Sequence, residues 1–245
     1  MSLKKRFEQL NEVAAKDVDP KMEYHTTLSP KLWNGEKLKS NVKPALMKVV
    51  DEFMTFLDHD AKVLDVTILG SACNYNYSHI SDLDVHIIVD CKSDDIEYKF
   101  LNARKKNWED THQISFKGFP VEVYVQSSDE VISKTAAIYS LKTNKWIRKP
   151  DKEVPPPNFD DPKITKKAAD IMTRIDNAIK MSGVEAEKEL TKLKAEVKEL
   201  RKKGIAISGE YDVSNLVFKT LRNNKYMDKL VKRLNEVIDE RLTVK

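Results

Sequence analysis

Residues 68–89 read ILGSACNYNYSHISDLDVHIIV, in which two short apolar segments flank a polar turn. The first apolar segment ends at Gly70-Ser71, and the second opens with Asp82-Leu83-Asp84. Successive strand residues alternate between the two faces of a sheet, so Asp82 and Asp84 point the same way. The pattern predicts strands over residues 63–69 and 83–89, with the Gly-Ser pair at the end of one strand and two carboxylates at the start of the other.

These residue types favour phosphate chemistry at a metal ion. Two neighbouring carboxylates repel one another unless a cation lies between them, and aspartate oxygens are the hard ligands that Mg²⁺ prefers. A Gly-Ser pair after a strand allows close backbone approach and offers a hydroxyl to a phosphate oxygen. Metal-binding carboxylates that face a phosphate site are the components of phosphoryl and nucleotidyl transfer.

The same residues carry a family resemblance. An apolar segment, Gly70-Ser71, ten residues and then Asp82-Leu83-Asp84 resembles the signature of the DNA polymerase β-like nucleotidyltransferase superfamily. That superfamily uses a third carboxylate from a later strand, and Glu122 in the alternating segment FPVEVYVQ (residues 119–126) matches it, although aspartate is frequent at this position. The resemblance covers residues 64–126. Residues 74–77, 121–126 and 138–141 look most like small nucleotidyltransferases predicted in bacteriophage genomes.

The resemblance implies a fold and a reaction. The fold would be α+β, with a small mixed sheet and helices as the nucleotidyltransferase core, followed by a C-terminal helical bundle. Asp82, Asp84 and Glu122 would be both catalytic and metal-binding, with Mg²⁺ as the cofactor and Mn²⁺ as a substitute. Gly70 and Ser71 would contact the outer phosphates of an NTP. A nucleoside monophosphate would pass to an acceptor hydroxyl, and pyrophosphate would leave.

Further candidate residues each have a structural alternative. Ser81 could orient the metal site or cap the turn, and Tyr139 could stack on the nucleobase or belong to the core. Lys219 and Arg222 match the basic residues that superfamily members present to the triphosphate, but they also fit a solvated helix face. His86 lies on the face of Asp84, where a hydrogen-bonded structural role is favoured over a role as base.

The acceptor stays open between several classes. The net charge is +4, and the whole excess lies in residues 151–245, which favours a polyanion such as RNA, for example a tRNA 3′ end. The alternatives are a synthase of cyclic or 2′-5′-linked oligonucleotides, an enzyme that nucleotidylates a protein or a small molecule, and a non-catalytic nucleotide-binding module. Three carboxylates in place argue against the last alternative.

Composition bounds the class of protein. A chain of 245 residues with 40% hydrophobic and 33% charged residues can bury one full core and a smaller helical part. No apolar run approaches the roughly 18 residues that span a bilayer, and the first residues show no apolar signal core. Cys73 and Cys91 have no metal-ligand spacing and are expected to be free thiols. We therefore expect a cytoplasmic protein without a membrane partner.

Hydrophobic periodicity divides the chain into two domains, residues 1–150 and residues 151–245. The triple proline at 155–157 is a stiff connector between them. In the first domain we expect helices over residues 3–16, 42–57 and 94–108, an irregular stretch over 19–39, a hairpin around Lys117-Gly118, and a last strand within 141–148. In the second domain we expect a helix capped by Asp160 or Asp161, a second helix from Ser182-Gly183 to Gly204, and a last helix over 213–242 that is interrupted near Asn223-Asn224.

Overall fold

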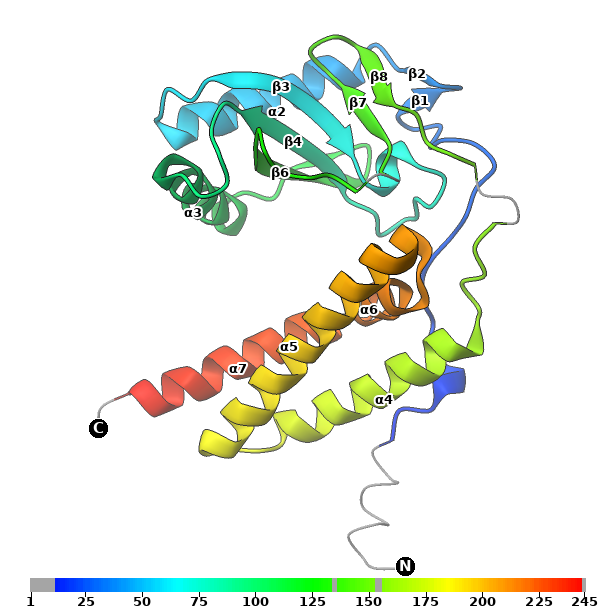
Figure 1. Ribbon diagram of the computed structural model, residues 1–245, viewed down its shortest axis with the longest axis vertical. Helices are drawn as coiled ribbons and strands as arrows, with labels where there is room; N and C mark the ends of the chain where they lie inside the picture. Colours follow the sequence, from blue (N-terminus) through cyan, green and yellow to red (C-terminus); the bar gives the residue numbers. More distant parts are fainter. Residues whose placement is uncertain (1–11, 134–135, 153–155, 244–245) are drawn as a thin grey trace, which may run out of the picture. The chain divides into compact units, whose positions relative to one another are not determined.

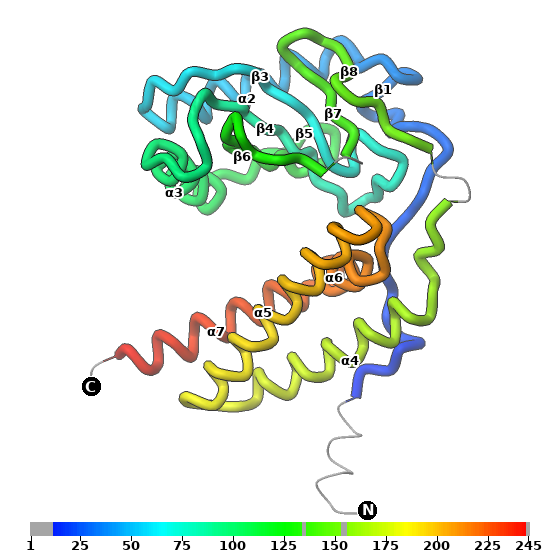
Figure 2. The backbone as a smooth tube through the Cα atoms, in the orientation of Figure 1, coloured from blue at the N-terminus to red at the C-terminus, as the bar shows by residue number. Residues whose placement is uncertain are grey.

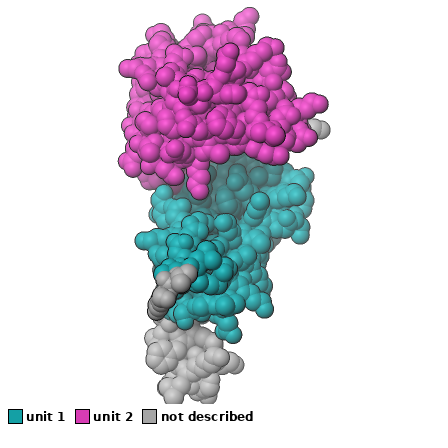
Figure 3. Space-filling view, turned by 90° about the vertical axis from the view of Figure 1, so that its left-hand side faces the viewer, with its two compact units in different colours: residues 1–22, 157–245 teal, residues 23–156 magenta. Residues whose placement is uncertain are grey.

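The computed structural model describes residues 12–133, 136–152 and 156–243 of the chain. It is an α+β protein that divides into two compact units, shown in different colours in Figure 3. We call Glu23–Pro156 the sheet unit, and Met1–Met22 together with Pro157–Lys245 the helical unit. Among the described residues, no helix is long and apolar enough to cross a membrane.

A mixed six-stranded sheet forms the centre of the sheet unit (Figure 1). Its strand order is β5-β6-β4-β3-β7-β8; β4 and β6 are parallel, and every other neighbouring pair is antiparallel. Its strands are β3 (Val63–Leu69), β4 (Leu83–Val89), β5 (Ser115–Phe116), β6 (Phe119–Ser127), β7 (Ile138–Ser140) and β8 (Lys145–Arg148).

The core lies on one face of this sheet. Alternate residues of β4, from Leu83 to Val89, are buried against apolar residues of α2 (Val42–Leu57) and α3 (Ile96–Thr111). Trp108 of α3 packs edge-on against Phe53 of α2, which joins the two helices to one another. The other residues of β4, including Asp84 and His86, lie on the opposite face, so the two carboxylates expected at this strand are directed away from the apolar core.

The described residues of the helical unit form four α-helices: α4 (Pro162–Ile179), α5 (Gly183–Ser208), α6 (Val213–Asn223) and α7 (Tyr226–Leu242). Asp161 caps α4 by accepting a hydrogen bond from Lys163 N (2.8 Å), and Pro162 occupies the first turn, as the sequence predicts. The break near Asn223-Asn224 is also confirmed. One side of each helix, for example Ile164, Leu190 and Leu230, is buried in a second apolar core.

The N-terminal segment differs from the predicted division at residue 150. Val18 is buried in the core of the helical unit, and Val13 N donates to Thr173 Oγ1 of α4 (2.8 Å). Asn223 Nδ2 donates to Pro20 O (3.0 Å) and Lys21 O (3.2 Å), which satisfies carbonyls that an irregular segment leaves open. Figure 2 shows this segment beside α4. The helical unit is therefore assembled from two separate parts of the chain.

Several other boundaries also differ from the predictions. Most of the helix expected over residues 3–16 lies outside the described residues; within them, 12–14 are irregular and η1 (Ala15–Asp17) is a single 3₁₀ turn. The stretch 19–39 includes two short strands, β1 (Trp33–Asn34) and β2 (Lys37–Leu38). The single strand expected within 141–148 is a hairpin of β7 and β8, whose turn has Asn144 at φ 56°.

Candidate active site

Gly70 and Asp84 are in direct contact at the ends of two neighbouring strands. Leu69 of β3 pairs with Asp84 of β4, and Gly70 follows with φ 69° and ψ −161°, a conformation that is essentially restricted to glycine. A Cβ atom added to Gly70 would lie 1.9 Å from Asp84 Oδ2. The carboxylate therefore lies against the glycine backbone, in space that any side chain at position 70 would fill.

Serine hydroxyls tie the turn after Gly70 to the start of β4. Ser71 Oγ donates to Ser81 Oγ (2.9 Å), and the same oxygen of Ser81 accepts from Ser78 N (2.8 Å). Ser71 begins the short 3₁₀ turn η2 (Ser71–Cys73), and Ser81 directly precedes Asp82. Ser81 therefore caps the turn, which is one of the two roles considered for it. Its contact with Ser71 holds the Ser71 hydroxyl beside the first residues of β4.

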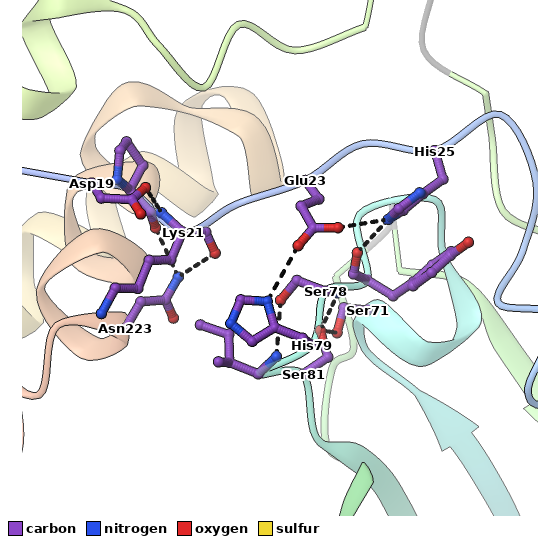
Figure 4. Close-up of polar contacts among 12 residues, drawn as sticks. Asp19, Lys21, Glu23, His25, Ser71, Ser78, His79, Ser81 and Asn223 are labelled. Atoms are coloured by element: carbon purple, nitrogen blue, oxygen red, sulfur yellow. Dashed lines mark hydrogen bonds and ion pairs between the residues drawn. The ribbon is translucent and has the colours of Figure 1, made fainter. Parts of the chain in front are cut away.

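Residues 23–25 hold the same turn from a distant part of the sequence. His25 N donates to Tyr75 O (2.7 Å), His25 Nε2 lies 2.8 Å from Tyr77 O, and the His25 ring stacks on the Tyr77 ring with centroids 3.9 Å apart. Glu23 lies between His25 and His79, with oxygens 3.4 Å from a ring nitrogen of each (Figure 4). The aromatic residues of the turn therefore pack on the chain itself, and the turn is held at both sides.

Asp84 and Glu122 are neighbours across the parallel pair of β4 and β6. Their Cα atoms are register partners, and paired residues of adjacent strands point to the same face, about 4.8 Å apart along the sheet. Asp82 lies on this face two residues earlier, at the start of β4. Asp82 and Asp84 are half-buried and Glu122 is exposed. The fold thus brings all three predicted carboxylates to one end and one face of the sheet.

The donor set fits a divalent cation in chemistry and in backbone register. Carboxylate oxygens from two adjacent strands are the ligand type that Mg²⁺ prefers, and the space over Gly70 that a Cβ would fill holds the Asp84 carboxylate. Within the part of the chain that the structure describes, however, no group of three or more His, Cys, Asp or Glu side chains converges closely enough to hold a metal ion. The backbone pairing thus aligns Asp84 with Glu122, but the three carboxylates do not form a closed set of metal ligands.

A buried thiol lies near Asp84. Cys73 is fully buried, and burial, followed by the nearby charge of Asp84, raises the pKa of its thiol well above the usual value. The thiol therefore stays protonated and acts as a small apolar group. Both cysteines are free, as expected from the sequence.

A groove opens beside Glu122. Its volume is about 770 Å³, and it is lined by the end of α3 and the start of β6, including Lys105, Trp108, His112 and Glu122. The His112 ring stacks on Trp108 with centroids 3.7 Å apart. The third predicted carboxylate therefore borders a groove large enough for a small molecule.

A polar network on the same sheet face was not predicted from the sequence. His86 Nδ1 donates to Gln126 Oε1 (2.8 Å), and burial lowers the pKa of the imidazole, which favours its neutral form. The Tyr124 hydroxyl contacts both carboxylate oxygens of Glu130 (3.1 Å each) and the Tyr98 hydroxyl (3.1 Å). Burial and these hydrogen bonds raise the pKa of Tyr124. The contacts of His86 agree with the structural role that the sequence favours. The network could have been inferred from the polar residues that alternate with apolar ones along β4 and β6.

The remaining predicted residues are Tyr139 of β7 and two basic residues of α6. Tyr139 is buried and lies edge-on to both Trp33 and Trp146, with centroid distances of 5.1 Å to each. Its hydroxyl donates to Asn144 Oδ1 (3.0 Å). These contacts correspond to the core alternative. Lys219 and Arg222 belong to α6 of the helical unit, where Lys219 forms an ion pair with Glu210 and Arg222 is exposed.

Comparison with protein-family models, with curated proteins and with solved structures finds no match to this chain.

Proposed function

We propose that the sheet unit is the catalytic core of a metal-dependent nucleotidyltransferase related to the polymerase β-like superfamily. The reaction would transfer a nucleoside monophosphate from an NTP to an acceptor hydroxyl and release pyrophosphate. The observation that carries this proposal is the contact of the Asp84 carboxylate with Gly70, with Ser71 adjacent and Glu122 in register on the next strand. A carboxylate pair facing a glycine-serine turn is the arrangement that phosphate transfer needs.

In this mechanism the residues serve as metal ligands, as phosphate contacts and as the acceptor of a proton. Asp82, Asp84 and Glu122 would hold Mg²⁺ or Mn²⁺, which supplies charge neutralisation at the phosphates and lowers the pKa of the acceptor hydroxyl. The Gly70 backbone would contact the outer phosphates, and the Ser71 hydroxyl would join it by turning its single proton from Ser81 Oγ to a phosphate oxygen. The acceptor oxygen forms a bond to the α-phosphorus while the bond to the bridging oxygen breaks. Glu122 takes up the acceptor proton, and pyrophosphate carries away the electron pair of the broken bond.

The test is incubation of the protein with each radiolabelled NTP and Mg²⁺ or Mn²⁺, with and without total tRNA. Label should enter a product in the wild type, and Asp82→Ala or Asp84→Ala should remove it. The melting temperature of these variants should stay level or rise, because one of two repelling carboxylates is deleted. Asp60→Ala, which changes an exposed acid of the same unit, is the matched control and should keep the activity.

The product separates the acceptor classes. Label in RNA supports an RNA acceptor, label in protein a protein acceptor, and label in new small nucleotides a synthase of oligonucleotides. Wild-type protein that labels no product, or an Asp84→Ala variant with near-normal turnover, would overturn the proposal.

A further inference from the structure

Positive charge is concentrated in two stretches of the sheet unit. Residues 30–50 and 142–149 together hold nine Lys or Arg residues and one acidic residue, Glu36. The net charge of residues 1–150 does not reveal this excess, because acidic residues elsewhere in that range cancel it. A local excess of this kind is the electrostatic footprint of an anionic partner.

The fold brings these stretches together around the start of α2. Lys117 Nζ donates to Lys31 O (2.8 Å) and to Asn41 Oδ1 (3.3 Å), while Lys43 Nζ donates to Lys142 O (3.4 Å). The hairpin of β7 and β8 lies beside β1 and β2 (Figure 1), where Trp146 Nε1 donates to Glu36 O (2.9 Å). We call the following residues the lysine surface: Lys31, Lys37, Lys39, Lys43, Lys117, Lys142 and Lys145.

The lysine surface lacks acidic partners. Within the described residues, none of its seven ammonium groups forms an ion pair; where they make contacts, these are with carbonyl or amide oxygens and aromatic rings. The carboxylate of Glu36 is engaged with Lys149 (2.6 Å). The first turn of α2 contains no acid, and Asn41 does not cap it. The positive end of the helix dipole therefore adds to the charge of the lysines.

We propose that the lysine surface binds the phosphate backbone of RNA. Ammonium groups spread over separate segments suit a chain of phosphates, since each contact is a point charge without a required geometry. Trp146, stacked on Trp33 with centroids 4.7 Å apart, adds a half-buried aromatic ring next to Lys145. In the proposed function the bound RNA would be the acceptor, and this role rests on that function. The binding of RNA to the lysine surface does not depend on it.

The test compares two variants that lose the same charge. The first carries Lys31→Gln, Lys37→Gln, Lys43→Gln and Lys145→Gln. The matched control carries Lys188→Gln, Lys194→Gln, Lys198→Gln and Lys202→Gln on α5. Binding of a fluorescein-labelled single-stranded RNA and of total tRNA is measured by anisotropy and by competition over a range of salt concentrations. EDTA is present and NTP is absent, so binding is separated from catalysis.

The first variant should bind RNA at least about tenfold more weakly than the wild type, and its plot of log affinity against log salt should be flatter by about 0.7 per lost contact. The control should bind like the wild type, and circular dichroism should show both variants folded. Equal weakening in both variants, or no RNA binding by the wild type at low salt, would overturn the inference. Binding to anionic lipid vesicles but not to RNA would also overturn it. RNA binding without any nucleotidyl transfer would leave the inference standing and remove the proposed function.

Discussion

The two units bury their polar side chains very differently. Among the described residues, eight buried polar side chains belong to the sheet unit and two to the helical unit. The two in the helical unit, Asn215 and Thr220, bond to nearby carbonyls of Glu210 and Leu216. In the sheet unit Thr67 is fully buried, and its hydroxyl has no hydrogen-bond partner among the described residues, a situation that costs about 1–3 kcal/mol. Buried polarity that costs stability is expected where a fold serves chemistry.

Surface charge separates the units in the same way. Several lysines and arginines of the helices pair with nearby acids, as Arg174 does with Glu196 at 2.7 Å and Lys203 with Glu199 at 3.6 Å. The lysine surface has no such pairs within the described chain. Net charge per unit therefore does not show where cations lie without an acidic partner. The helical unit carries the positive excess but pairs part of it with its own acids, while the sheet unit gathers, among the described residues, seven lysines without an ion pair at one place.

Among the changes that separate the sheet unit from the helical unit, replacing Gly70 by alanine should have the largest effect. The new Cβ would lie 1.9 Å from Asp84 Oδ2 in a backbone conformation that favours glycine, so the carboxylate must move. We expect nucleotidyl transfer to fall by about 10²-fold or more, the size seen when one electrostatic contribution to a transition state is removed. Turnover of labelled NTP is the measurement.

Gly35→Ala is the matched control for Gly70→Ala. Gly35 also has a positive φ, of 59°, but no atom lies within 4 Å of the position that a Cβ would take there. Alanine at this position adds backbone strain alone, so stability should fall by about 1–2 kcal/mol while turnover is kept. Equal losses of turnover in the two variants would assign the effect of Gly70→Ala to strain, and the contact with Asp84 would lose its functional meaning.

Mg²⁺ together with an NTP should stabilise the sheet unit selectively. At a ligand concentration about a hundred times the dissociation constant the gain is about 2.7 kcal/mol. All three tryptophans, Trp33, Trp108 and Trp146, lie in the sheet unit, so tryptophan fluorescence follows its unfolding. The shift should vanish when a chelator replaces the metal. A shift of equal size with chelator would point to a nucleotide site that does not involve Asp82 and Asp84.

Gly204→Ala should act on the helical unit alone. Alanine is favoured over glycine in a helix by about 1 kcal/mol, but the new Cβ would lie 2.7 Å from Asp212 Oδ1 and 2.9 Å from Asn215 N. Backbone cannot yield as a flexible side chain does, so we expect a net loss of about 1–3 kcal/mol. Far-ultraviolet circular dichroism should show earlier melting of helix, while the tryptophan transition stays in place. A stabilised variant would contradict this packing.

Gly204 also shows why some boundaries were not predictable from the sequence. Glycine after an apolar stripe indicates a helix end, yet α5 continues to Ser208, because Gly204 serves close packing against the start of α6. Three periodic elements were predictable to the residue: helix 42–57 and strands 63–69 and 83–89 coincide with α2, β3 and β4. The helix expected over 94–108 exists as α3, but it begins two residues later and ends three residues later. The apolar spacing of these elements is local, whereas the partner of Gly204 lies eight or more residues further along the chain.

The candidate site follows the same division. The proximity of Gly70 to Asp84 could be expected from spacing, because two adjacent strands with a short connection pair in an antiparallel hairpin. The contacts of Glu23 and His25 with the turn could not be expected from the sequence, because their partners are about 50 residues away and no local pattern marks them. For Tyr139 the sequence allowed both core packing and stacking on a base, and only its contacts with Trp33 and Trp146 decide for the core.

The smallest effect is expected from the basic residues of α6 and the start of α7. Lys219 pairs with Glu210, and Lys225 Nζ lies 3.9 Å from Asp228 Oδ2, so of the three cations Arg222 has no acidic partner within the described residues. Lys219→Gln, Arg222→Gln and Lys225→Gln together should therefore flatten the salt dependence of RNA binding by no more than about one unit. Anisotropy measurements against the lysine-surface variant give the comparison. A raised KM for NTP with unchanged RNA affinity would instead assign Lys219 and Arg222 to the triphosphate, as the family resemblance implies. A loss of RNA affinity larger than that of the lysine-surface variant would transfer the RNA site to the helical unit.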